Sequence, residues 1–287
     1  MRKLSMMLLG SLSLAFAGPK TMTTVLPYAG YIDYSSGSDK SSAVVGGLYA
    51  SIYRAPNKLE LAVEHTRIKY RHNLPNLNQT DLTAIYTRYR GYHLAYKIGA
   101  HYIDSDDKVT DGAFTGILGV NWYNYLHYNI GLDAYATHYH NDASGRTWDS
   151  MNVWQFRPYA GYNFGTYAST MGSFYLEAEY NGIFIPDAGA KGYNSSYHSA
   201  GLSLYHYKGK WTHMIKGWVG QKIYSVNNGG FTVYNLGELY KGGVSASVSY
   251  AIRPNTSLKL QYEYSRFEHL GNKAHSNSIV AMVSHTF

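Results

Sequence analysis

The chain has 287 residues and no cysteine, which excludes a disulfide framework, a thiolate nucleophile and a lipid-modified amino-terminal cysteine. Its 25 Lys and Arg residues against 18 Asp and Glu give a formal charge of +7, but the cations are scattered, so no basic stripe indicates nucleic-acid binding. Tyrosine occurs 31 times, and its amphipathic ring favours β-strands and membrane interfaces.

Residues 1–17 have the features of a cleavable secretory signal. Arg2 and Lys3 precede a short apolar run that ends in Ala15-Phe16-Ala17. The run is about a dozen residues long, whereas a membrane-spanning helix needs about 20. We therefore predict cleavage after Ala17 and an exported domain at 18–287.

Strict alternation of apolar and polar residues recurs from about residue 24 to the end of the chain. In the segment 92–102, Tyr, Leu, Ile and Ala at even positions oppose His, Lys and Gly at most odd positions. No window shows a convincing helical period. A soluble β-sandwich also alternates, but here Tyr and Trp lie near the ends of the apolar faces, which favours a transmembrane barrel.

Short and long links take turns between these segments, as expected of a barrel with brief periplasmic turns and larger external loops. The sequence therefore predicts an all-β fold, an antiparallel up-and-down barrel of about 14 strands, with 12 or 16 as alternatives. A change in the parity of the apolar face near His65 suggests a β-bulge, and the region 231–243 is the least regular. The expected strands are 23–35, 43–54, 58–71, 80–90, 92–104, 112–123, 125–139, 151–165, 172–185, 196–208, 211–225, 232–252, 256–268 and 276–287.

The last predicted strand, 276–287, alternates up to an aromatic residue, Phe287. It resembles the closing strand of Gram-negative outer-membrane β-barrel proteins, whose terminal aromatic residue is read by the barrel-assembly machinery. The resemblance implies a location in the cell outer membrane, contact with its lipid and lipopolysaccharide, and Phe287 as the assembly signal.

In length and strand count the chain is similar to monomeric porins of about 14 strands, which admit sugars or other small solutes. This resemblance implies a channel for passive or gated diffusion of small hydrophilic solutes, with no cofactor. No long inward-folding loop is evident in the sequence, and we take its absence to favour a monomer. A side-chain-filled barrel is the alternative. From strand parity we expect these residues to line the lumen: Glu60, Glu64, His93, Lys97, His101, Asp133, Arg157, Glu177, Glu179, Lys216, Lys259 and Glu263.

Two other functions need consideration: a lipid hydrolase, and a structural or adhesive barrel acting through its external loops. A serine hydrolase on a strand would place His and Ser two residues apart, and no His in the chain has this spacing. The loop 140–146 contains His140, Asp142, Ser144 and Arg146, which are common loop residues. We therefore predict that the protein is not an enzyme.

Two groups of polar residues near the predicted strand ends suggest ligands. Arg67, Lys69 and Arg71 could pair with anionic groups of lipopolysaccharide. The acidic and histidine residues at 104–107 and 138–142 offer oxygen and nitrogen ligands, but their spacing matches no known metal-binding loop, so we predict no metal site.

Overall fold

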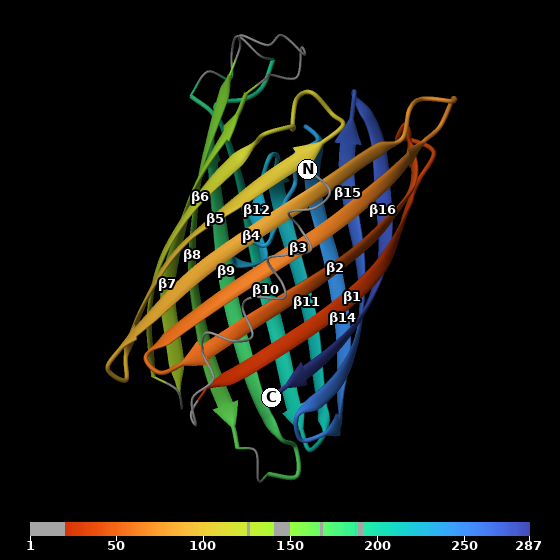
Figure 1. Cartoon of the computed structure of the whole chain (residues 1–287). Helices are drawn as coiled ribbons and strands as arrows, with labels where there is room; N and C mark the ends of the chain where they lie inside the picture. The colour runs from red at the N-terminus through yellow and green to blue at the C-terminus, as the bar shows by residue number, and fades with distance from the viewer. Residues whose placement is uncertain (1–20, 125–126, 141–149, 167–168, 187, 189–191) are drawn as a thin grey trace.

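The computed structural model describes residues 21–124, 127–140, 150–166, 169–186, 188 and 192–287, and the predicted signal 1–17 lies outside them. Within the described residues, 14 antiparallel strands close into one barrel (Figure 1), which confirms the predicted fold class and strand count. Each wall strand pairs with the next along the chain, and β1 pairs with β16 to close the ring. The wall strands are β1 (Met22–Tyr34), β2 (Lys40–Arg54), β3 (Asn57–Tyr70), β4 (Leu77–Arg90), β5 (Leu94–Ser105), β6 (Phe114–Asn124), β7 (Tyr128–Tyr139), β8 (Met151–Gly165), β9 (Ser173–Phe184), β10 (Ser196–Lys208), β11 (Trp211–Lys222), β14 (Leu239–Arg253), β15 (Thr256–His269) and β16 (Asn272–Thr286).

The outer surface of the barrel is apolar and the inner surface is largely polar. Many of the alternate residues that face outward are large exposed hydrophobic side chains, as at Ile98 of β5 and Ile215 of β11. Aromatic rings gather on this surface near the strand ends, where Phe164 stacks on Phe174 and Phe174 stacks on His206. An apolar belt edged with aromatic residues is the surface that a transmembrane barrel presents to lipid. In the described residues no helix is long and apolar enough to cross a membrane.

The prediction of a bulge near His65 is wrong. The register of β3 with β4 runs without a shift from Asn57 to Ile68, and its register with β2 is also regular around His65. His65, Arg67 and Lys69 are exposed residues of the same outward face as Leu61 and Val63. The outward face of β3 therefore changes from apolar to polar at one end of the strand. In the sequence, this change of polarity on one face looks the same as a change in which residues face outward.

The expected strand 232–252 is also wrong in its first part, because β14 begins only at Leu239. Residues 223–238, which we call the lumen loop, fold into the barrel interior and carry the short strands β12 (Val226–Asn227) and β13 (Thr232–Val233) with the 3-10 turn η3 (Asn228–Gly230) between them (Figure 1). Three successive residues at the tip, Asn228, Gly229 and Gly230, have positive φ angles of 51°, 70° and 114°. Glycine adopts such angles without steric cost, so the loop can reverse here.

Another prediction that fails is the absence of a long inward-folding loop. The lumen loop is such a segment, and the argument for a monomer that used its absence no longer holds. The link between β15 and β16 differs as well: the strands end at His269 and restart at Asn272, where a longer loop at 270–275 was expected. The strands β1, β3, β5, β7 and β9 end on the side of the barrel opposite Met22 and Phe287, so the long links that follow them begin there.

Candidate functional site

The lumen loop is attached to the barrel wall by polar contacts from several strands. Gln155 of β8 bonds both backbone groups of Val226: its Nε2 donates to the carbonyl oxygen, and its Oε1 accepts from the amide nitrogen, each at 2.8 Å. Asn235 Nδ2 donates to Gln79 Oε1 of β4 at 2.7 Å. These contacts join residues 71 and 156 positions apart in the sequence.

Two lysines contact the loop from other strands. Lys40 Nζ of β2 lies 2.8 Å from Glu238 Oε1, and both side chains are nearly inaccessible, at 4% and 2% exposure. Lys97 Nζ of β5 donates to the carbonyl oxygen of Gly229 at 3.4 Å. The loop is therefore tied at both ends and near its tip.

Apolar packing surrounds the loop in the barrel interior. Ile223, Tyr224, Val226 and Val233 belong to one buried cluster with inward residues of β4 to β9, while Tyr234 and Leu236 pack against a second cluster that includes Phe267. At the tip, a Cβ added to Gly230 would overlap Ile117. Burial, together with the hydroxyl of Tyr193 at 2.8 Å, raises the pKa of the Tyr224 hydroxyl well above its ordinary value. The loop thus occupies this section of the lumen with a packed core.

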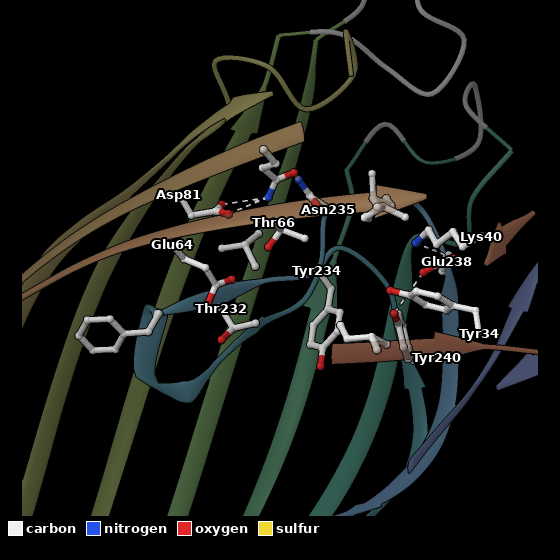
Figure 2. A pocket seen from close by; sticks show the side chains of 16 residues that line it. Tyr34, Lys40, Glu64, Thr66, Asp81, Thr232, Tyr234, Asn235, Glu238 and Tyr240 are labelled. Carbon is white, nitrogen blue, oxygen red and sulfur yellow. Dashed lines mark hydrogen bonds and ion pairs between the residues drawn. The ribbon is translucent and has the colours of Figure 1, made fainter. Parts of the chain in front are cut away.

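A pocket of about 130 Å³ remains between the lumen loop and strands β1 to β4 (Figure 2). Its wall side includes Glu64 and Asp81, and its loop side includes Thr232 and Asn235. Both carboxylates already have partners: Tyr28 donates to Glu64 at 2.6 Å, and Gln79 and His101 contact Asp81 at 2.9 Å and 3.1 Å. The pocket therefore has a mixed wall, with Ile32, Ile68 and Phe231 beside carboxylates that are already bonded to neighbouring residues.

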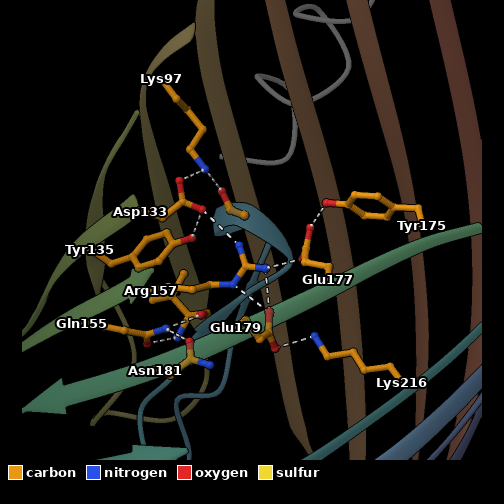
Figure 3. A network of polar contacts seen from close by, with 12 residues as sticks. Lys97, Asp133, Tyr135, Gln155, Arg157, Tyr175, Glu177, Glu179, Asn181 and Lys216 are labelled. Carbon is orange, nitrogen blue, oxygen red and sulfur yellow. Dashed lines mark hydrogen bonds and ion pairs between the residues drawn. The ribbon is translucent and has the colours of Figure 1, made fainter. Parts of the chain in front are cut away.

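A charge network occupies the inner faces of β5, β7, β8, β9 and β11 (Figure 3). Arg157 is at its centre, with contacts to Asp133 at 3.3 Å, Glu177 at 3.2 Å and Glu179 at 2.6 Å. The network continues through Lys97 to Asp133 at 2.7 Å and through Lys216 to Glu179 at 2.6 Å. Three cations thus face three anions, so the network has no net charge.

Six of the twelve residues expected to line the lumen belong to this network, and the other six lie elsewhere. Glu60 accepts from Lys58 and Tyr49, Glu64 accepts from Tyr28, and Glu263 accepts from Ser265. Lys259 lies on the inward face of β15, between the outward Leu258 and Leu260. His101 is buried against Asp81 and Thr83, and His93 lies in the turn between β4 and β5, where its ring contacts the carbonyl oxygen of Tyr123.

Apart from Lys97, which was expected in the lumen, the residues that attach the lumen loop were not predicted from the sequence. Gln79, Asp81 and Gln155 lie at inward positions of their strands, so parity alone would have placed them in the lumen. Lys40 and Glu238 lie at or beyond strand ends, where parity gives no information. Two adjacent glycines, Gly229 and Gly230, were the only local indication that this link differs from a hairpin turn.

The three basic residues proposed to contact lipopolysaccharide divide into two kinds. Arg67 and Lys69 are exposed on the outer face of β3. Arg71 instead donates to two backbone carbonyl oxygens, that of Tyr34 at 2.7 Å and that of Lys40 at 3.2 Å. Only the first two have side chains directed to the barrel surface without such internal bonds in the described structure.

The residues considered for catalysis and for metal binding make the following contacts in the described structure. A His-Ser neighbour pair, His198 and Ser199, occurs in β10, but the two side chains lie on opposite faces of the strand, with Ser199 buried at 4% exposure and His198 bonded to Tyr180. Asp106 accepts from Asn78, and Asp107 accepts from the amide of Val109. Most of the loop 140–146 lies outside the described residues. In the described residues no three His, Cys, Asp or Glu side chains are grouped to hold a metal ion.

The closed 14-stranded wall, the apolar belt and the polar interior define an outer-membrane β-barrel protein. No protein-family model matches the chain, and no curated protein matches it by sequence. Solved structures do match it, among them the toluene transporter TbuX of Ralstonia pickettii, with a TM-score of 0.59 and 9% identity over 94% of this chain and 90% of that one.

Two further structures have the same fold. The toluene transporter TodX of Pseudomonas putida matches with a TM-score of 0.53 and 9% identity, over 96% of this chain and 91% of that one. The NanC porin matches with a TM-score of 0.51 and 14% identity, over 91% of this chain and 98% of that one. At these identities the likeness concerns the fold alone.

Proposed function

We propose that the protein is a gated channel of the bacterial outer membrane, and that it admits small hydrophilic solutes when the lumen loop moves away from the wall. The observation that carries the proposal is the lumen loop itself. It crosses the interior against a wall that carries two apolar clusters as well as polar groups, and it is tied there by individual side chains, Gln155, Gln79 and Lys40. On this proposal, the arrangement in which the loop is bonded to the wall is the closed state.

The charged side chains on the inner face are evidence for hydrophilic rather than hydrocarbon solutes. The structures with a similar fold include both toluene transporters and a porin, so the fold does not select between these substrates. Here Arg157, Lys97 and Lys216 with their carboxylate partners occupy the inner face, where an apolar solute would have to displace their hydration. We infer that the twelve residues expected from strand parity either line the path of the solute or hold the side chains that line it.

Single-channel recording tests the gate. The chain has no cysteine, so Gln79→Cys/Asn235→Cys can be joined selectively with a short bis-methanethiosulfonate reagent. We expect open steps from the uncross-linked protein in a planar bilayer, their loss on cross-linking and their return with reductant. Each single-cysteine variant, treated in the same way, is the control.

The two apolar clusters around the loop favour a second candidate function, a permanently closed structural barrel. A protein that is folded by circular dichroism and heat-modifiable on gels, yet silent at all voltages both as wild type and with the loop 224–237 shortened to Gly-Ser, would favour this second function. Conductance only after the loop is shortened would locate the block in the loop.

We also propose that Arg67 and Lys69 contact anionic groups of lipopolysaccharide at the outer end of β3. Both cations face away from the lumen, and the same outward face of β3 is apolar earlier in the strand, at Leu61 and Val63. A cation at this level lies where lipid phosphates are found.

A further inference from the structure

A set of tyrosines lines the half of the lumen nearest Met22 and Phe287, where the short turns join the strands. They lie at inward positions within about six residues of the strand ends that form the short turns. Edge-to-face contacts join Tyr53 to Tyr89 and Tyr89 to Tyr123, with ring centroids 6.0 Å and 6.3 Å apart. The set consists of Tyr28, Tyr49, Tyr53, Tyr89, Tyr123, Tyr159, Tyr175, Tyr205 and Tyr207, and we call it the tyrosine wall.

Several of these rings lie flat against the barrel because the neighbouring strand has glycine beneath them. A Cβ added to Gly47 would overlap the ring of Tyr28, and one added to Gly131 would overlap the ring of Tyr159. The paired strands place Tyr28 opposite Gly47 and Tyr159 opposite Gly131. One face of each ring therefore covers backbone, and both side chains remain partly exposed on the lumen side. The guanidinium carbon of Arg157 lies over the Tyr159 ring, 4.8 Å from its centroid.

The hydroxyl groups of three tyrosines are fixed by carboxylates. Tyr28 donates to Glu64 at 2.6 Å, Tyr49 to Glu60 at 2.6 Å, and Tyr175 to Glu177 at 2.7 Å. These bonds hold the rings in place and leave the remaining carboxylate lone pairs as acceptors beside an apolar ring face. The tyrosine wall thus combines rigid apolar faces with hydrogen-bonding groups at their edges.

The remaining lumen surface at this level is polar but has little net charge. The network around Arg157 has three cations and three anions, and Lys58 pairs with Glu60 at 2.9 Å. Serines occupy inward positions of β14, β15 and β16, where Ser257 and Ser284 lie 2.7 Å apart. Such a surface offers hydrogen bonds in all directions and no field that would favour an ion.

We propose that the tyrosine wall binds a neutral oligosaccharide. A pyranose ring has an apolar face of C–H groups, which fits a flat aromatic ring, and a rim of hydroxyls, which fits the carboxylates and serines at its edge. The absence of net charge in the wall favours an uncharged sugar over an acidic or amino sugar. The site faces the end of the barrel with the short turns, so it is open from the periplasm while the lumen loop is closed.

This inference names the substrate class of the proposed channel, but it can be tested without conductance. Isothermal titration calorimetry on the full chain, in a detergent without a sugar headgroup, measures binding of cellohexaose and maltohexaose. Hexagalacturonate and chitosan hexamer are the anionic and cationic comparisons. We expect at least one neutral hexasaccharide to bind more tightly than both charged ones, and failure of both neutral sugars to bind, or tighter binding of a charged one, would overturn the proposal.

Variants of Tyr159 test whether the ring face carries the binding. Tyr159→Leu should weaken binding about tenfold, whereas Tyr159→Phe, which keeps the face, should bind within about twofold of wild type. Tyr180→Leu, on the lipid-facing side of β9, is the matched control for loss of a tyrosine and should not change affinity. Equal affinity of Tyr159→Leu and wild type would overturn the assignment to the tyrosine wall. Sugar binding by a protein that never conducts would refute the channel and leave this inference standing.

Discussion

The side-chain amide of Gln155 pairs with the backbone of Val226 as a neighbouring strand would, donating to its carbonyl oxygen and accepting from its amide at 2.8 Å each. One wall residue thus satisfies both polar groups of a loop residue that is buried at 1% exposure. Without Gln155 the two backbone groups would be left without these partners in the interior, and such groups are costly.

Gln155→Leu should therefore shift the loop toward the open state. Loss of both bonds removes about 2 kcal/mol from the closed state, which corresponds to roughly a 30-fold increase in the open-to-closed ratio. Single-channel open probability measures this ratio. Gln261→Leu, on the inner face of β15, is the control, since its side chain makes no described contact with the lumen loop. An unchanged open probability in Gln155→Leu would contradict the role of this contact.

The buried ion pair between Lys40 and Glu238 should hold the other end of the loop. Glu238→Gln leaves the lysine without its charge partner in a nearly inaccessible site, which costs about 3–5 kcal/mol. Protease cleavage within 223–238 should accelerate in this variant. The double variant Lys40→Met/Glu238→Leu should recover much of the loss, because neither charge then remains buried; a double variant as sensitive as the single one would count against the ion pair.

The network around Arg157 should set ion selectivity in the open channel. Glu177→Gln leaves three cations against two anions, and reversal potentials should then shift toward anion selectivity. Lys216→Gln leaves two cations against three anions and should shift the potentials in the opposite direction. A shift of the same sign in both variants would show that these residues do not face the ion path.

Gly131 should be required for the position of the Tyr159 ring. Gly131→Ala places a Cβ where the ring now lies, so the ring must swing into the lumen and narrow it. We expect a lower conductance in the open state and a lower melting temperature. Gly217→Ala, where a Cβ would meet no atom within 4 Å, should change neither.

Arg67 and Lys69 should behave differently from Arg71 toward lipopolysaccharide. Arg67→Gln/Lys69→Gln should lower the affinity for lipid A roughly 30-fold, from about 1 kcal/mol for each cation near an anionic surface, without changing stability in detergent. Arg71→Gln should lower stability in detergent, because its two carbonyl acceptors lose their donor. Native mass spectrometry with lipid A and thermal unfolding separate the two effects.

The wall of the barrel was predictable from the amino-acid sequence. Strand parity is a local property, so Ile98 and Lys97 could be assigned to opposite faces from their positions alone. For the same reason the count of 14 strands was correct, although the outward polar residues His65, Arg67 and Lys69 were misread as a shift in parity. The position of Arg157 was predictable, but its partners were not, since the register between strands selects them.

The filling of the lumen depends on contacts between residues far apart in the sequence. Residues 223–225 and 232–238 were expected to belong to strands, with a link between them. The whole segment 223–238 instead folds inward because Gln155, Gln79 and Lys40, distant in the sequence, bond its backbone and side chains. Its apolar residues are buried against inward residues of β4 to β9, which no local pattern brings together. Long-range contacts of this kind depend on closure of the barrel, and so the sequence could predict the wall that surrounds the lumen but not the loop that occupies it.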